Sequence, residues 1–165
     1  MNKDKKYKIK NFSKYTFSDK GIIVFLDFDR FRECVKEKNW SEYTPNKFSG
    51  FLTNKLLEYT RKYQAVHLWG INKRRGTEEA ILLFLQEKKQ VKAIFEELRK
   101  KICNMAKEIR VNTSLSVGIA EGTIQNLKKI KSHAKKEFMN NPTVYLAYKA
   151  LKEAKKKGGN KIISY

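Results

Sequence analysis

The sequence predicts an α+β fold, an α/β sandwich in which helices pack on a central antiparallel sheet. Strand-like runs alternate with helix-like runs along the chain. Their order, β-α-β-β-α-β followed by a further helix and strand, is that of the ferredoxin-like palm. A length of 165 residues is enough for one domain with a proper core. We therefore expect one domain over residues 21–165, preceded by a basic tail or loosely attached element at residues 1–20.

The first predicted strand and helix are separated by a stretch without a clear pattern. Residues 21–28, GIIVFLDF, are apolar and β-branched at their start, as in a buried strand. Residues 30–46 do not favour either a helix or a strand. Residues 46–63 predict a helix, because their apolar side chains recur at helical spacing behind a proline. These side chains are Phe48, Phe51, Leu52 and Leu56.

The middle of the chain predicts a hairpin and a long helix. Residues 64–71 and 78–86 are strand-like, and the polar run between them contains Gly76, as a hairpin turn would. Residues 91–109 predict a helix with one buried stripe, since their apolar positions recur in steps of three and four.

The last third predicts two strands and two helices. Residues 111–119 alternate strictly between apolar and small polar side chains, which is typical of a strand. Residues 123–138 predict a short basic helix. A second helix is expected to begin with Asn141 as its cap and Pro142 as its first residue, and to end at Gly158 and Gly159. KIISY closes the chain as a strand.

The charge of the chain favours anionic partners. With 37 Lys+Arg against 17 Asp+Glu, the formal net charge is +20, which attracts nucleic acid, nucleotides or an anionic surface. A lysine-rich composition also arises from thermophily or biased base composition, so the charge by itself leaves both explanations open.

Composition also bears on location. The longest apolar runs are too short to cross a bilayer, so no membrane insertion is expected. The first 14 residues have charges but no apolar stretch of the signal-peptide kind. Cys34 and Cys103 lack metal-type spacing and suggest reduced thiols, so we predict a cytoplasmic protein.

Two carboxylates stand at the tip of the first predicted strand. Asp27 and Asp29 follow its apolar run, where a carboxylate is costly unless a positive group lies beside it. That group could be a metal ion or the cation of a structural ion pair. In a palm the hairpin of the second and third strands lies beside this tip, which would bring Glu78 and Glu79 close to both aspartates.

Converging carboxylates of this kind suit divalent cations. Mg²⁺ prefers oxygen ligands shared with substrate phosphates, and a pair of ions about 3.5–4 Å apart can activate a 3′-hydroxyl and stabilise leaving pyrophosphate. Amide N–H groups in the turn after Asp29, with Arg30 and Arg32 beside them, could receive a triphosphate. Taken singly, each feature also fits a turn, a cap or a solvated surface.

Four segments resemble, in order, the GGDEF-type nucleotidyl cyclases and their relatives, the palm domains of CRISPR-associated polymerases. DFDRFR resembles the Asp-x-Asp-x-Phe-Lys motif, and GTEEAILLF lies where Gly-Gly-Asp/Glu-Glu-Phe and its strand would be. SLSVGIAEG resembles the Thr-Val-Ser-Ile-Gly-Ile-Ala strand, and AYKALKEAKKKGGNKI resembles the closing Ala-Leu-x-x-Ala-Lys-x-x-Gly-Arg-Asn motif. The segments are residues 27–32, 76–84, 114–122 and 147–162.

The resemblance implies a site with two Mg²⁺ or Mn²⁺ ions. Asp27 would ligate both ions, the backbone of Phe28 would assist, and Glu78 would complete the metal site. Glu79 would be an auxiliary ligand or catalytic carboxylate. Lys155 matches the family lysine that contacts the triphosphate. The implied nucleotide-binding set is Phe28, Asp29, Arg30, Phe31, Arg32 and Lys155, with Asp29 mainly supporting the loop and the amides of residues 30–32 holding phosphates.

The chain departs from the family pattern at four positions. Thr77 replaces the second glycine of the hairpin motif, and Ala80 replaces its phenylalanine. Gly159 stands in place of the closing arginine. Val35 stands where the guanine-reading asparagine would fall, which puts guanine specificity in doubt.

The resemblance implies a nucleotidyltransferase that joins nucleoside triphosphates into a cyclic dinucleotide or short cyclic oligonucleotide. Ring closure in this family needs two facing protomers, so a homodimer is expected. The likeness to stand-alone CRISPR-polymerase-like enzymes suggests a role in antiviral defence signalling. The alternatives are a degenerate palm that binds nucleotide or nucleic acid within a larger complex and, more weakly, a nucleotide hydrolase like the archaeal GTP ring-opening enzymes.

Overall fold

The computed structural model describes residues 19–125, 127, 130 and 134–165. The tail or element predicted for residues 1–20 lies outside the described residues except for its last two. Of these, Lys20 is the first residue of β1.

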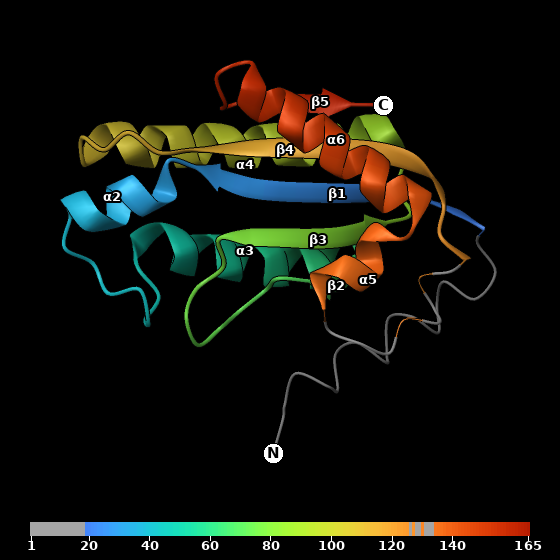
Figure 1. Cartoon of the computed structure of the whole chain (residues 1–165), viewed down its shortest axis with the longest axis horizontal. Helices are drawn as coiled ribbons and strands as arrows, with labels where there is room; N and C mark the ends of the chain where they lie inside the picture. The colour runs from blue at the N-terminus through green and yellow to red at the C-terminus, as the bar shows by residue number, and fades with distance from the viewer. Residues whose placement is uncertain (1–18, 126, 128–129, 131–133) are drawn as a thin grey trace.

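A five-stranded sheet forms the centre of the molecule (Figure 1). The strands are β1 (Lys20–Asp29), β2 (Val66–Trp69), β3 (Glu79–Phe84), β4 (Ser114–Thr123) and β5 (Ile162–Ser164). They lie in the order β2-β3-β1-β4-β5, and every neighbouring pair is antiparallel except β4 and β5, which are parallel. The predicted ferredoxin-like palm is therefore confirmed, with β5 as a parallel edge strand.

Helices cover both faces of this sheet. They are α2 (Phe31–Glu37), α3 (Lys47–Lys62), α4 (Lys88–Glu108), α5 (Lys135–Met139) and α6 (Pro142–Lys156). In Figure 1, α3 and α4 lie behind the sheet, whereas α5 and α6 lie in front of it. None of the helices in the described ranges combines the length and apolar character that a membrane crossing requires.

The alternation of side chains along β1 separates two cores. Ile22, Val24, Leu26 and Phe28 pack with the apolar faces of α2, α3 and α4, while residues 23 and 25 pack with α5 and α6. Successive strand residues point to opposite faces, so Asp27 and Asp29 continue the second set. The face of β1 that meets α6 thus changes from apolar to acidic at its C-terminal end.

Two segments differ from their sequence-based expectation. The pattern-free stretch 30–46 contains the short helix α2, whose buried residues are Phe31, Cys34 and Val35. The basic helix predicted for residues 123–138 is wrong at its start, because β4 continues to Thr123 as a partner of Lys20 in β1. Residues 126, 128–129 and 131–133 of this segment lie outside the described residues. In the described part of this region α5 covers only Lys135–Met139.

Helix α6 packs very closely on β4, which determines what its last turn can reach. A Cβ on Gly118 would lie 2.0 Å from the carbonyl oxygen of Ala147, so the helix backbone rests almost directly on the strand. Asn141 caps the first N–H groups of the helix, as predicted. At the other end, the N–H groups of Gly158 and Gly159 bond to the carbonyls of Lys155 and Ala154, the pattern of a Schellman motif.

Candidate active site

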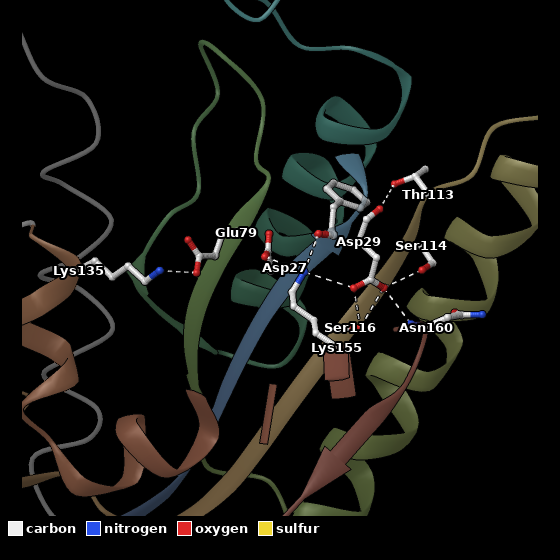
Figure 2. A network of polar contacts seen from close by, with 10 residues as sticks. Asp27, Asp29, Glu79, Thr113, Ser114, Ser116, Lys135, Lys155 and Asn160 are labelled. Atoms are coloured by element: carbon white, nitrogen blue, oxygen red, sulfur yellow. Dashed lines mark hydrogen bonds and ion pairs between the residues drawn. The ribbon is translucent and has the colours of Figure 1, made fainter. Parts of the chain in front are cut away.

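Polar side chains from four elements meet where β1 ends (Figure 2). The register places Asp27 opposite Glu79 of β3 on one side and opposite Ser116 of β4 on the other. Asp29 is opposite Ser114. Directly opposed residues of antiparallel strands point to the same face, so these side chains all face α6. The predicted approach of the strand tip and the hairpin is confirmed.

Lys155, in the last turn of α6, places its ammonium at the centre of this cluster. Its Nζ lies 2.9 Å from Oδ2 of Asp27 and 3.3 Å from Oδ1 of Asp29, and it donates a 2.8 Å hydrogen bond to the carbonyl of Phe28. Of the two explanations that the sequence left open for the carboxylates, the ion pair is therefore present. The oxygens of Asp27 and Phe28 that meet this cation are two of the predicted metal ligands.

The carboxylate of Asp29 forms hydrogen bonds with the surrounding fold. It accepts hydrogen bonds from the hydroxyls of Ser114 at 2.7 Å and Ser116 at 2.9 Å, and from the backbone N–H of Asn160 at 2.8 Å. Burial acts to raise the pKa of Asp29, but these hydrogen bonds together with the Lys155 charge outweigh it and hold the pKa below 3.8. With its side chain only 12% exposed, Asp29 joins β1 to β4 and to the turn after α6.

Asp27 has the opposite electrostatic balance. Burial raises its pKa above 3.8, and the neighbouring charges of Glu79 and Asp29 add to this effect, although Lys155 opposes it. Its side chain remains 32% exposed. The Lys155 ammonium alone does not offset the cost of ionising the buried Asp27, so this carboxylate is suited to bind a further cation.

The two glutamates of the hairpin are placed differently. Glu79 lies opposite Asp27 and is paired with Lys135 of α5 at 2.5 Å (Figure 2). Glu78 is exposed, and its backbone carbonyl accepts a 3.2 Å hydrogen bond from the N–H of Phe28. Lys135 therefore balances the charge of Glu79.

The donor set at Asp27 fits a hard cation supported by few protein ligands. A carboxylate oxygen and a carbonyl oxygen already converge on the ammonium of Lys155, which stands in for such a cation. Within the described ranges, no three Asp, Glu, His or Cys side chains form a group that could hold a metal by themselves. Mg²⁺ characteristically uses one or two carboxylates and completes its shell with water and substrate phosphates.

The turn that follows Asp29 is left-handed and leads directly into α2. Arg30 has φ 54° and precedes the first helical residue without a side-chain cap. Phe31 is buried and stacks on Phe28 with ring centroids 4.8 Å apart, whereas Arg30 and Arg32 are exposed. The N–H groups of a first helical turn lack intrahelical acceptors, and the predicted phosphate-holding amides of residues 30–32 directly follow Asp29 in the chain.

Thr77 is explained by contacts with α3. Its hydroxyl lies 2.8 Å from that of Thr53 and accepts a hydrogen bond from the N–H of Asn72, while its own N–H donates to the Thr53 hydroxyl and the Ser49 carbonyl. The side chain is fully buried. Thr77 therefore fastens the hairpin to α3 and does not project its Cβ toward the cluster.

The other departures also have structural reasons. Gly159 has φ +74°, and a Cβ there would lie 2.8 Å from the carboxylate of Asp29, so an arginine would displace that anchor. Ala80 is fully buried opposite Leu26. Val35 is 6% exposed within the core and offers no polar group for reading a base.

Four residues of this cluster were not identified from sequence. For Lys135 the sequence predicts only a position in a basic helix, and no site role follows from the sequence for Ser114, Ser116 or Asn160. The two serines had a usable signal, because they occupy the polar face of a strictly alternating strand. Lys135 had none, since its position depends on how α5 folds back onto the sheet.

The arrangement of strands and helices is the palm fold of GGDEF domains. No protein-family model and no curated protein matches the sequence. The solved structures do. The active GGEEF domain of a diguanylate cyclase from Vibrio cholerae superposes with a TM-score of 0.60 at 14% identity, over 98% of this chain and 92% of the other.

Two further structures agree. One contains the coiled coil and GGDEF domain of DgcB from Caulobacter crescentus in complex with c-di-GMP, with a TM-score of 0.58 at 12% identity, over 98% of this chain and 78% of the other. The other is the diguanylate cyclase SiaD from Pseudomonas aeruginosa in complex with its activator SiaC. It superposes with a TM-score of 0.53 at 20% identity, over 98% of this chain and 56% of the other. At these identities the likeness establishes the fold.

Proposed function

We propose that this protein is a divalent-metal-dependent nucleotidyltransferase that joins nucleoside triphosphates into a cyclic dinucleotide or short cyclic oligonucleotide. The observation that carries the proposal is the convergence of Asp27, the Phe28 carbonyl and Lys155 on one point, with Glu79 directly across the strand pair. The GGDEF-domain fold supports it, because the compared cyclases have this fold.

Each residue of the cluster has a role in this proposal. Asp27 and the Phe28 carbonyl hold Mg²⁺ or Mn²⁺, with Glu78 as a further ligand and Glu79 as auxiliary ligand or catalytic carboxylate. When bound, two such ions supply Lewis acidity for the attacking 3′-hydroxyl and for the departing pyrophosphate. The Lys155 ammonium leaves Asp27 and pairs with the triphosphate, and Asp29 holds the turn after α6 in place.

The remaining phosphate contacts and the base preference follow from neighbouring segments. The amides of Arg30, Phe31 and Arg32 receive phosphate oxygens, and the exposed arginine side chains add positive charge. Because Val35 is apolar and buried, this position gives no preference for guanine. We therefore propose that the substrate need not be GTP.

Ring closure from two nucleotides requires two sites that face each other, so we propose that the active form is a homodimer with two-fold symmetry. A role in antiviral defence signalling stays a prediction from the resemblance to CRISPR-associated palms.

One observation favours a second candidate function. Each of the two opposed carboxylates already has its own lysine, Lys155 on Asp27 and Lys135 on Glu79. A palm neutralised in this way could bind nucleotide or nucleic acid through its basic surface without catalysis, as part of a larger complex.

One experiment separates the two candidates. The full-length protein is incubated with each labelled nucleoside triphosphate and with Mg²⁺ or Mn²⁺, and pyrophosphate and nucleotide products are separated by chromatography. We expect a cyclic product whose formation falls by at least about 100-fold in Asp27→Ala and in Glu78→Ala. Glu108→Gln, an exposed change at the end of α4 outside the proposed set of ligands, is the matched control and retains the activity.

Tight, strongly salt-dependent binding of oligonucleotide without any turnover would instead support the non-catalytic palm. Release of inorganic phosphate or an opened nucleotide in place of a joined product would point to a hydrolase.

A further inference from the structure

The ammonium of Lys135 lies in a cage of aromatic rings. Its Nζ is 5.3 Å from the ring centroid of Phe25, 5.4 Å from that of Trp69 and 6.0 Å from that of Tyr148. The carboxylate of Glu79 accepts a 2.5 Å hydrogen bond from the same ammonium. We call Phe25, Trp69, Tyr148 and Glu79 the lysine cage.

The cage is assembled by the tertiary fold. Its rings come from β1, β2 and α6, its carboxylate comes from β3, and the lysine is the first residue of α5. Phe25 is fully buried, and the side chains of Lys135 and Glu79 are 35% and 23% exposed. A surface lysine normally extends its ammonium into water. This one is turned inward, toward ring faces whose negative quadrupole attracts a cation.

The cage adjoins the candidate active site. Phe25 precedes Asp27 by two residues on the same face of β1, and Glu79 is the cross-strand neighbour of Asp27. A carboxylate oxygen that is bonded to an ammonium is less available to a divalent cation, because the two positive charges repel each other at short range. Lys135 and a metal ion at Asp27 therefore compete for Glu79.

We propose that the lysine cage is a binding site for a primary ammonium, occupied by Lys135 of the same chain, and that Lys135 competes with the divalent cation for Glu79. This inference rests on the proposed function. The cage holds the lysine in a defined place while no cation is bound, and the ammonium leaves the Trp69 ring when Glu79 turns to the metal. Lys135 is thus a positioning residue that acts through Glu79.

Trp69 provides a readout that does not depend on catalysis. The chain has two tryptophans, and Trp40, which packs beside Phe48 with ring centroids 6.0 Å apart, is first replaced by phenylalanine. Mg²⁺ alone is then titrated into the protein, while Trp69 emission and the calorimetric dissociation constant are recorded. The variants are Lys135→Gln, Lys135→Arg and, as the matched control, Lys152→Gln, whose ammonium lies 5.3 Å from the same Tyr148 ring.

We expect Mg²⁺ to change Trp69 emission saturably in the parent protein. In Lys135→Gln the emission starts near the Mg²⁺-bound value and no longer responds, and Mg²⁺ binds about fivefold tighter or more. Lys152→Gln behaves like the parent, and Lys135→Arg, which keeps the charge, restores parental affinity. Far-UV circular dichroism establishes that each variant is folded.

The outcomes separate this inference from the proposed function. If Mg²⁺ binds the parent and Lys135→Gln equally well, or Trp69 responds identically in both, the competition is refuted while the proposed function stands. If Mg²⁺ alone binds no variant, the competition is refuted, whereas the proposed function is decided separately by the product assay, in which the nucleoside triphosphate supplies the remaining Mg²⁺ ligands. If removing Lys152 tightens binding as much as removing Lys135, the effect is general electrostatics and the cage has no special role.

Discussion

At the scale of single residues, two aspartates that are two positions apart in one strand differ in what surrounds them. Asp29 receives hydrogen bonds from two serine hydroxyls and a backbone N–H, and its pKa is lowered. The pKa of Asp27 is raised mainly by burial, and the charge of Glu79 adds to this effect, while the Lys155 ammonium opposes it. The Asp29 carboxylate stabilises the fold, whereas the Asp27 carboxylate is available to bind a ligand.

This contrast predicts different effects on stability. Asp29→Asn should lower the free energy of unfolding at pH 7 by about 1–3 kcal/mol, because an NH₂ group then faces a donor that the carboxylate had satisfied. Asp27→Asn should cost less, since ionisation of Asp27 is disfavoured in the folded state. Denaturant unfolding of both variants beside the parent protein measures the difference.

The pH dependence of the same variants has a definite sign. A lowered pKa means that Asp29 stabilises the fold above its ordinary value of 3.8 and loses this contribution as the pH falls through its folded value. Below about pH 4 the parent protein should therefore lose a component of stability that Asp29→Asn has already lost. Parallel stability curves for parent and Asp29→Asn through this range would contradict the assignment.

At the scale of elements, the end of α6 decides where Lys155 lies. The chain turns through two glycines with φ +101° and +74°, and the next N–H reaches Asp29. Asn141 at the start of this helix and the two glycines at its end were predictable, because capping and left-handed turns demand particular residue types. The sequence did not indicate that the start of the helix predicted for residues 123–138 belongs to β4, because the pairing of Thr123 with β1 is a long-range contact.

The two glycines give a matched test of this turn. Gly158→Ala and Gly159→Ala both place alanine at positive φ, at a cost of about 1–2 kcal/mol. A Cβ at Gly158 meets nothing within 4 Å, whereas one at Gly159 meets the Asp29 carboxylate at 2.8 Å. Gly159→Ala should therefore be destabilised by about a further 1–3 kcal/mol in denaturant unfolding. Equal losses in the two variants would show that Asp29 does not pack against this turn.

At the scale of the whole molecule, the sequence predicts the sheet order and the approach of two loops, but not the partners of each carboxylate. Strand and helix periodicities fix the ferredoxin-like order, and that order places Asp27 beside the hairpin. Which lysine meets which carboxylate depends on helix packing over β4 and on the position of α5, both set by contacts distant in sequence. Lys155 was expected from a motif, while Lys135 became visible only in three dimensions.

The central claim is that Asp27, the Phe28 carbonyl and Lys155 form a site for a divalent cation and a triphosphate. Its most direct test is anomalous scattering from Mn²⁺ in crystals of the protein grown with a non-hydrolysable nucleoside triphosphate. We predict a Mn²⁺ signal at the Asp27 carboxylate and the Phe28 carbonyl, with the Lys155 ammonium moved from Asp27 to the phosphates. Nucleotide bound elsewhere, or no Mn²⁺ at Asp27 with Lys155 still paired to it, would contradict the claim.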